Sequence, residues 1–290
     1  MKKIISNLRS IYAYIKFLYL RKKITFKIKD SLETLDYIIK NKVSVSRFGD
    51  GEFLIIKKKS IGFQEANEEL GTKLLEILQK PIEKHITCLP YYMFNQNNVK
   101  PKSAQYWRSV FLKHWRLLND NCKQPYYFDA CFTRFYMIFK KKDHAPIIIN
   151  KIKMLWDKRN ICIVEGENTC FGINNDFLDN VQGIERIICP SADAFSYYES
   201  IINTIKAKIQ KDKLILIALG ATATALAYDL TELGYQAIDI GHADIEYMWY
   251  KMGATEKCAI PGKAVNEVGI NHTARIQDEN YQKQIIATIL

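Results

Sequence analysis

The chain has 290 residues, 48% hydrophobic and 25% charged, which is an ordinary balance for a folded protein with a substantial core. Its net charge of +11 would suggest a nucleic-acid partner if the charge were spread over the surface. Instead, residues 1–29 carry nine Lys or Arg and no acid, which leaves 33 basic and 31 acidic residues in the remainder. The excess is local, and we expect no nucleic-acid partner.

The basic N-terminal segment has the pattern of an amphipathic helix. At about 100° per residue, apolar side chains share one stripe and basic side chains lie opposite. The stripe consists of Ile4, Leu8, Ile11, Ile15 and Leu18, flanked by Ile5, Tyr12 and Tyr19, and the basic side chains are Lys2, Arg9, Lys16 and Arg21. This pattern is typical of an in-plane anchor on an anionic membrane and also of a helix packed on the protein's own core. The charges that interrupt the stripe exclude a transmembrane span.

Beyond residue 30, strand-like and helical segments alternate, which predicts an α/β fold with a Rossmann-like, mostly parallel sheet and flanking helices. Strands are expected at Val43–Phe48, Ile86–Leu89, Tyr126–Phe135, Ile161–Val164, Ile184–Cys189, Leu214–Leu219 and Tyr235–Ile240. Helices are expected at Ser31–Lys40, Asn67–Gln79, Ser103–Leu118, Ile147–Trp156, Asp193–Ile209 and Ala221–Leu233. We expect a basic segment at 1–29 and one domain over 30–290, with an N-terminal lobe to about 158, a Rossmann-like lobe at about 159–260 and a tail at 261–290. The seven cysteines are scattered without a Cys-x-x-Cys pair, which indicates buried, reduced thiols of a cytosolic protein.

A strand, a glycine turn and a helix follow one another at residues 214–233. Because ligands of parallel sheets bind at the carboxyl ends of strands, Gly220, Thr222 and Thr224 are candidate ligand contacts, and a helix N-terminus there can bind phosphate. Asp239 comes 19 residues after Gly220, where a Rossmann acid would hold a ribose. The segment lacks the Gly-x-Gly-x-x-Gly fingerprint and the Walker lysine, so a nucleotide is indicated more clearly than NAD.

Asp244 and Glu246 follow the last predicted strand with one residue between them. Two carboxylates at this spacing can bind one divalent cation, which would bridge the diphosphate of a nucleotide substrate. The alternative is a pair of solvated surface acids. His242 is a candidate third ligand or phosphate donor, and equally a structural histidine that closes the turn.

Arg47, Gly49, Asp50, Gly51 and Glu52 form a second candidate site. The glycines allow a ligand to approach the backbone, and the arginine can bind phosphate bidentately. Either acid could bind sugar hydroxyls or act as a base. An ordinary strand-to-helix turn with an Arg–Asp ion pair explains the same residues.

Two further strand ends carry polar residues. Glu165 lies in an acidic turn after its strand, and Ser191 follows the next one. Ser191 or Asp193 could cap the following helix, or the loop could contact a base or ribose. Trp107 and Trp115 are expected in the core rather than in a sugar-binding platform.

Several of these blocks together resemble the bacterial GT-D fold glycosyltransferases, a family first catalogued as a domain of unknown function. The blocks are Ser46–Glu52, Ile163–Glu167, Ile188–Ser191, Asp193–Phe195, Ala218–Thr224 and Ala237–Tyr247, spread from about residue 30 to about residue 260. The resemblance implies a Rossmann-like fold that holds Mn²⁺ and a UDP-sugar through an Asp-x-Glu motif, here Asp244 and Glu246, and passes the sugar to a glycan acceptor. Ala221 departs from the family pattern, in which a proline is expected, and the N-terminal helix lies outside the resemblance.

The combined prediction is a cytoplasmic, metal-dependent glycosyltransferase with a nucleotide sugar as donor and a saccharide, lipid-linked or protein-linked, as acceptor. A lipid-linked acceptor would explain peripheral contact of residues 1–29 with the inner face of the cytoplasmic membrane. The alternatives are an NAD- or S-adenosylmethionine-dependent enzyme and a non-catalytic membrane- or nucleic-acid-binding protein. The predicted roles are catalysis for Asp50, Glu52 and His242; donor binding for Arg47, Gly49, Gly51, Glu165, Ser191, Gly220, Thr222, Thr224 and Asp239; and Mn²⁺ or Mg²⁺ binding for Asp244 and Glu246.

Overall fold

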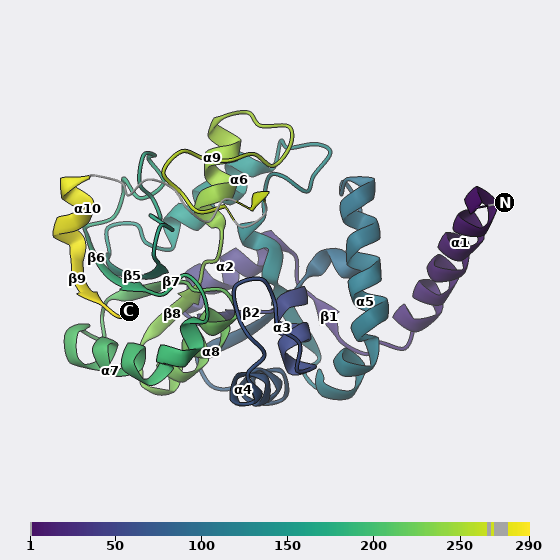
Figure 1. Ribbon diagram of the computed structural model, residues 1–290, viewed down its shortest axis with the longest axis horizontal. Coiled ribbons are helices and arrows are strands. Elements are labelled where there is room, and N and C mark those ends of the chain that lie inside the picture. Colours follow the sequence, from purple (N-terminus) through teal and green to yellow (C-terminus); the bar gives the residue numbers. More distant parts are fainter. Residues whose placement is uncertain (1, 266–267, 270–277) are drawn as a thin grey trace.

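A nine-stranded sheet runs through the molecule, and every strand pairing described in it is parallel (Figure 1). The structure is a computed structural model that describes residues 2–265, 268–269 and 278–290, with only the backbone for residues 2–9. The strand order is β1-β4-β3-β2-β8-β7-β5-β6-β9. The strands are β1 (Lys27–Ile28), β2 (Ser44–Arg47), β3 (His85–Leu89), β4 (Tyr126–Asp129), β5 (Asn160–Gly166), β6 (Gly183–Cys189), β7 (Leu214–Ala218), β8 (Gln236–Asp239) and β9 (Ile285–Thr288). The predicted α/β fold is confirmed.

Helices cover both faces of the sheet, with α2, α6 and α9 on one face and α4, α7 and α8 on the other (Figure 1). The helices are α1 (Lys2–Arg21), α2 (Ser31–Asn41), α3 (Asp50–Ile56), α4 (Glu68–Gln79), α5 (Pro101–Asn121), α6 (Ala145–Met154), α7 (Tyr198–Lys208), α8 (Ala221–Glu232), α9 (Ala243–Lys251) and α10 (Glu279–Gln284). Successive side chains along a strand point to opposite faces of the sheet. Ile215 and Ile217 pack in the core under α8, whereas Leu214 and Leu216 pack in the core under α6. The seven cysteines are free thiols, and all except Cys258 are buried, as predicted.

The two lobes expected from the sequence share this one sheet. β2, from the first lobe, pairs with β8, from the second, where Val45 lies opposite Ile238. The Ser46 hydroxyl also donates a hydrogen bond to the carbonyl of Thr224 in α8, at 2.6 Å. The boundary near residue 158 therefore falls between α6 and β5 and does not separate two sheets.

The sheet differs from the prediction at one strand end and at both edges. The predicted strand Tyr126–Phe135 ends at Asp129, whose carboxylate accepts a hydrogen bond from the Cys131 amide at 2.8 Å and so turns the chain into a 3₁₀ helix at Ala130–Thr133. The edge strands β1 and β9 were not predicted; β1 has only two residues, too few for a periodic pattern, and β9 follows a short helix directly at Ile285.

Helix α1 lies at one end of the molecule, with α5 between it and the remaining elements (Figure 1). Its predicted helical conformation is confirmed. The side chains of Lys2, Ile4, Ile5, Leu8 and Arg9, which contributed to the predicted stripe, lie outside the described part. Among the residues whose structure is described, no helix is both long enough and apolar enough to cross a bilayer.

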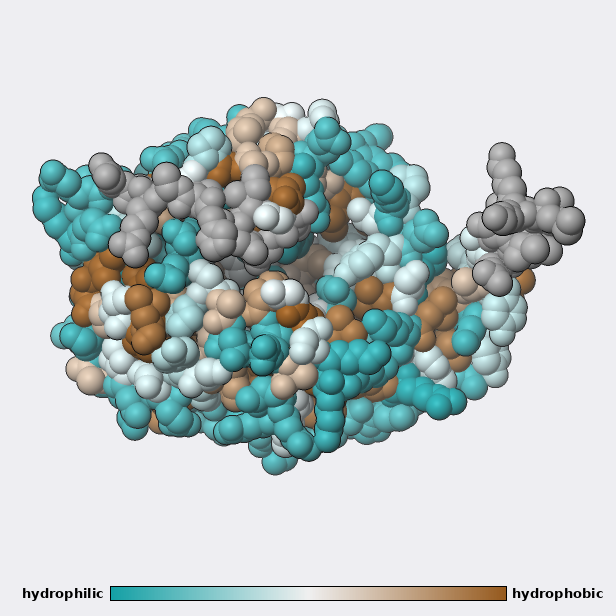
Figure 2. All heavy atoms as spheres, viewed as in Figure 1, coloured by the Kyte–Doolittle hydropathy of each residue, from teal (hydrophilic) through white to brown (hydrophobic). Residues whose placement is uncertain are grey.

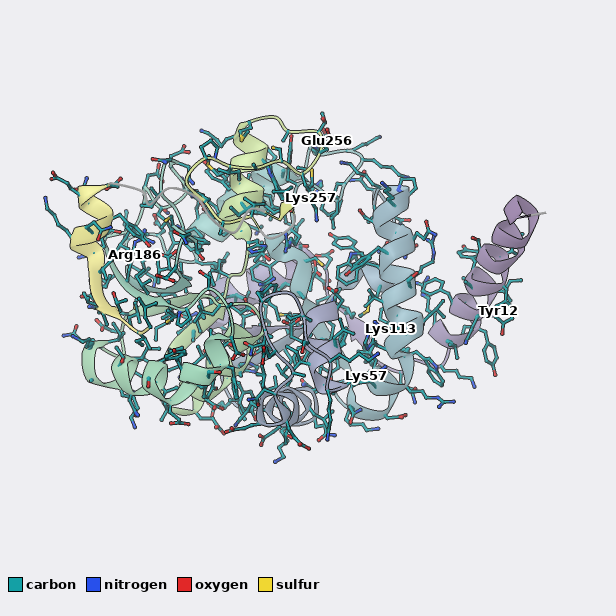
Figure 3. All side chains as sticks on the ribbon, in the orientation of Figure 1. Tyr12, Lys57, Lys113, Arg186, Glu256 and Lys257 are labelled. Atoms are coloured by element: carbon teal, nitrogen blue, oxygen red, sulfur yellow. The ribbon has the colours of Figure 1, made fainter. Side chains whose placement is uncertain are left out.

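A buried ion pair between Glu165 and Arg186 ties the C-terminal segment to the sheet. Nη1 of Arg186 lies 2.6 Å from Oε1 of Glu165, and both side chains are at most 1% exposed. The second carboxylate oxygen accepts the Phe171 amide at 2.8 Å. Nε of Arg186 donates to Gln284 at 2.7 Å, and the guanidinium lies over the Tyr281 ring of α10, 4.7 Å from its centroid. Arg186 itself is labelled in Figure 3.

Replacing Arg186 with Met should lower the free energy of unfolding by about 3–5 kcal/mol, because it leaves the Glu165 charge buried without its partner. Urea denaturation followed by circular dichroism measures this change. The control is Lys58→Met, which breaks the exposed pair with Glu68 and should leave the stability nearly unchanged. Equal losses in the two variants would contradict a structural role for the buried pair.

Candidate active site

A cleft of about 940 Å³ opens where β2, β5, β7 and β8 end, and the surface is hollowed near the centre of Figure 2. Carboxyl ends of parallel strands are where ligands of α/β sheets bind. Most of the residues predicted from the sequence line this cleft: Arg47, Gly49, Asp50, Gly51, Glu52, Ser191, Gly220, Asp239, His242, Asp244 and Glu246. Glu165, Thr222 and Thr224 are not among the lining residues.

Arg47 uses its guanidinium mainly to hold the strand ends together. Nε donates to the Asp239 carbonyl and Nη2 to the Asp239 carboxylate, both at 2.7 Å, while Nη1 donates to the Ala130 carbonyl and to the Thr133 hydroxyl at 3.1 and 2.8 Å. A Cβ on Gly241, where φ is +50°, would lie 1.9 Å from Nη2, so a glycine is required there. The arginine–aspartate ion pair that the sequence left as an alternative is therefore present, and bidentate phosphate binding by Arg47 would have to replace these bonds.

The predicted Gly49–Glu52 turn is the start of helix α3. The Glu52 carboxylate accepts the Gly49 amide, which closes the first turn. The pKa of Glu52 is raised to about 7, chiefly by burial and to a smaller extent by the Asp239 and Asp50 carboxylates, against the lowering effect of the backbone hydrogen bonds. Beside it, Asp50 lies next to the Tyr106 hydroxyl, and burial together with this carboxylate raises the pKa of the phenol.

Gly220 lies between β7 and α8 with φ +54°, and a Cβ there would meet the Phe63 ring at 2.4 Å. This glycine lets the loop that carries Phe63 pass over the strand end. Thr222 and Thr224, in contrast, are fully buried. The Thr222 hydroxyl donates to Gln64 at 3.2 Å, and the Thr224 hydroxyl donates to the carbonyl at the end of β2 at 2.9 Å. Both threonines therefore stabilise the loop and the sheet from inside. The prediction that they contact the nucleotide sugar is wrong, because their side chains are buried.

The two remaining residues predicted at strand ends, Ser191 and Glu165, have different positions. Ser191 lines the cleft and donates its hydroxyl to the Glu167 carbonyl, whereas Glu165 points into the buried pair with Arg186. The expected capping role is wrong, since Asp193 precedes the 3₁₀ helix without a side-chain bond to its backbone.

Asp244 lies in the first turn of α9 and is almost completely buried. One oxygen accepts the Asn175 side-chain amide at 2.8 Å. The other oxygen pairs with the Lys263 ammonium, and Lys263 is itself fully buried. A buried carboxylate with a full cationic partner is the arrangement that keeps a charge stable in a low-dielectric site.

Glu246 lies on the same helix but contacts a different part of the protein. One carboxylate oxygen accepts the amides of Tyr136 and Met137 at 3.0 and 2.9 Å. Arg134 approaches the other oxygen at 4.0 Å, and its second terminal nitrogen lies 3.1 Å from Nδ1 of His242. Although side chains two residues apart on a helix point in different directions, both acids line the cleft.

The donor chemistry of Asp244 and Glu246 fits a divalent cation that arrives with a phosphate substrate. Within the described ranges, no group of three or more His, Cys, Asp or Glu side chains could hold a metal by itself. Mg²⁺ is usually bound by one or two carboxylates, with substrate phosphates and water completing its shell. A cation at Asp244 would compete with the Lys263 ammonium for the carboxylate, since both are attracted to the same oxygens.

The cleft also contains residues that sequence reasoning missed. Arg134 was hidden inside the overlong predicted strand, although a strand ending at Asp129 would have put it near the carboxyl edge. Lys263 follows the region of resemblance, and nothing in the local pattern connects it with Asp244. Tyr106 and Trp107 line the wall formed by α5, so Trp107 is only partly a core residue.

Comparison with known proteins agrees with this geometry. The family model for the glycosyltransferase GT-D fold matches residues 45–268. Glycosyltransferase GlyD of Streptococcus pneumoniae is 36% identical over 266 residues, which are 91% of this chain but 33% of the relative, so the chain spans about a third of its length.

Two solved structures are similar over nearly their whole length. One, described as the domain of unknown function 1792 with a distinct glycosyltransferase fold, has a TM-score of 0.91 and 36% identity, covering 94% of this chain and 99% of the other. The second, a glycosyltransferase from Streptococcus sanguinis, has a TM-score of 0.88 and 32% identity, covering 91% and 100%. Of the activities left open by the sequence, these relatives favour glycosyl transfer. The chain belongs to the GT-D fold glycosyltransferase family.

Proposed function

We propose that this chain transfers a hexose from a nucleotide-diphosphate sugar to a saccharide acceptor during the assembly of a surface polysaccharide or a glycoprotein glycan. The donor that we expect is a UDP-sugar. The observation that carries the proposal is the pair of buried acids on α9, Asp244 and Glu246, inside a cleft that also presents cationic side chains. Family membership supports glycosyl transfer; the donor, the acceptor and the metal are the subject of this proposal.

The donor diphosphate would lie across the carboxyl ends of β7 and β8. Lys102, Arg134 and Lys257 line the cleft and would attract it, with Lys257 on the segment that follows α9 (Figure 3). Gly220, at the N-terminus of α8, lines the same cleft, and a helix N-terminus favours a bound phosphate. Fixed donors of this kind stabilise the charge that develops on a departing diphosphate.

Asp244 and Glu246 are the residues that would hold Mn²⁺ or Mg²⁺. Such a cation would neutralise part of the diphosphate charge and so make it a better leaving group. In this scheme the cation would replace Lys263 at Asp244, whose carboxylate stays oriented by the Asn175 amide, while the amides of Tyr136 and Met137 orient that of Glu246.

The acceptor would enter between α3 and α5. Glu52 has a pKa near neutrality, as required of a group that accepts a proton from a sugar hydroxyl at physiological pH. Asp50 would orient that hydroxyl from the same helix turn. The rings of Tyr106 and Trp107, 5.3 Å apart, give the wall an apolar surface on which a sugar ring can pack.

Removing either acid of α9 should reduce kcat/KM for transfer on the order of a hundredfold, because leaving-group charge is no longer stabilised. The variants are Asp244→Asn and Glu246→Gln, and the control is Asp212→Asn, an exposed acid that precedes β7 at the opposite end of the sheet. Thermal melting verifies that each variant folds. Full activity in both folded variants would rule out the proposed role of these acids.

Nucleotide release should require a divalent cation. The purified chain is incubated with a panel of UDP-, GDP- and dTDP-sugars, with Mn²⁺ or with EDTA, and released nucleotide is measured. We expect release from a UDP-sugar that EDTA abolishes and Mn²⁺ restores. Undiminished release in EDTA would contradict metal dependence, and release from another nucleotide sugar alone would replace UDP as the donor.

The rate should fall as the pH drops below about 7, because Glu52 must lose its proton to act as a base. In Glu52→Gln this limb of the pH–rate profile should disappear and the rate should be low at every pH. A second measurement is independent of activity: between pH 4.5 and about 7 the folded chain holds a proton that the unfolded chain releases, so this group lowers stability as pH rises. Glu52→Gln should remove that part of the slope of stability against pH; an unchanged profile and slope would contradict the assignment.

A further inference from the structure

Helix α1 packs on the protein through one narrow face. Phe17 and Leu20 are 3% and 5% exposed, and Ala13 is half-buried on the same side. The Phe17 ring meets the Phe111 ring of α5 edge-on, with 5.6 Å between centroids. The spacing of four and three residues from Ala13 to Leu20 is that of a single helix stripe. This inner face accounts for the docking of α1 on its own protein.

A second apolar face lies on the opposite side of the helix, and we call it the outer face. Its members follow the same helical spacing and are between 40% and 69% exposed. They are Ile11, Tyr12, Ile15, Leu18 and Tyr19. At about 100° per residue, the centre of this group is turned by about half a circle from Phe17 and Leu20. Figure 3 shows Tyr12 on α1 at the edge of the molecule.

The two faces resolve a choice that the sequence left open. The predicted apolar stripe contained Ile11, Ile15 and Leu18, and these side chains are on the outer face rather than in the contact with α5. Packing on the core is therefore achieved by other residues, and the described part of the stripe, Ile11, Ile15 and Leu18, is exposed. Scattered apolar side chains are common on protein surfaces, but a continuous patch of this kind marks an interaction site.

The charge around the outer face is complementary to an anionic surface. Lys16 and Arg21 border it on the helix, and Lys22 and Lys23 follow directly, with no acid anywhere in residues 1–29. The Lys23 ammonium lies over the Tyr19 ring at 4.7 Å. Tyrosines and long basic side chains around an apolar stripe suit the boundary between lipid headgroups and acyl chains.

We propose that the outer face of α1 docks in the plane of an anionic lipid surface. The apolar side chains would enter the acyl boundary while the flanking Lys and Arg contact headgroup phosphates. Phe17 and Leu20 keep the helix attached to α5 in the same state, so binding requires no unfolding of the contact with the protein. The proposal is independent of the reaction in the cleft, because no outer-face residue lines it.

Co-sedimentation of the full chain with vesicles tests this surface. We expect binding to vesicles of equal parts phosphatidylglycerol and phosphatidylcholine, little binding to phosphatidylcholine alone, and weaker binding at high salt. The double variant Ile11→Ser/Ile15→Ser should weaken partitioning on the order of tenfold or more, since two apolar side chains no longer leave water. The matched control Ile147→Ser, at an exposed position of α6, should bind as the unchanged chain does.

Charge is tested separately with Lys16→Gln/Lys22→Gln, which should reduce both the binding and its salt dependence while the outer face stays apolar. Melting temperatures check that all variants fold. The proposal is overturned if the unchanged chain remains in the supernatant with anionic vesicles, or if Ile11→Ser/Ile15→Ser binds as tightly as the control. It is also overturned if sedimentation velocity finds a dimer that this double variant abolishes, because a second copy of the chain would then cover the face.

Discussion

The ion pair between Arg47 and Asp239 is the interaction on which the arrangement of the cleft depends. It joins the ends of β2 and β8, and among the described strands this is the pairing through which the two halves of the sheet meet. The same guanidinium binds the turn after β4, which leads to Arg134. Burial raises the pKa of Asp239 against the lowering effect of Arg47, so this carboxylate depends on its partner to remain charged.

The carboxylates around the cleft are stabilised by different partners, and these partners determine which chemical role each carboxylate can have. Asp239 and Asp244 each have a cationic partner, while Glu246 is held by two backbone amides and approached by Arg134. Glu52 accepts a backbone amide, and burial, with a smaller contribution from the Asp239 and Asp50 carboxylates, raises its pKa to about 7. A set of carboxylates in different environments is how one fold keeps some acids charged and lets another exchange a proton near neutral pH.

The basic excess and the cleft belong to different parts of the molecule. Lys16 and Arg21 lie on α1 and Lys22 and Lys23 follow it directly, and α5 lies between that helix and the rest of the protein (Figure 1). Conversely, the N-terminal end of α5 supplies Lys102, Tyr106 and Trp107 to the wall of the cleft. Helix α5 is therefore the element that connects the proposed lipid-binding surface with the proposed acceptor side of the active site.

Local sequence was sufficient for the class of fold and for the interior of most elements. Continuous apolar runs such as Leu214–Ala218 are buried strands because both faces of a parallel sheet are covered, and Asn67 caps α4 through the Leu70 amide as predicted. The strand-end rule also brought most candidate residues to one cleft. The direction in which each side chain points, and therefore its partner, could not be predicted from local sequence. The partners of Glu165, Thr222 and Asp244 come from distant segments, Lys263 among them, and the exposed stripe of α1 could not be distinguished from its docking face until α5 was in position. Periodicity records which residues avoid water along one element, whereas side-chain pairing depends on which elements the fold brings together.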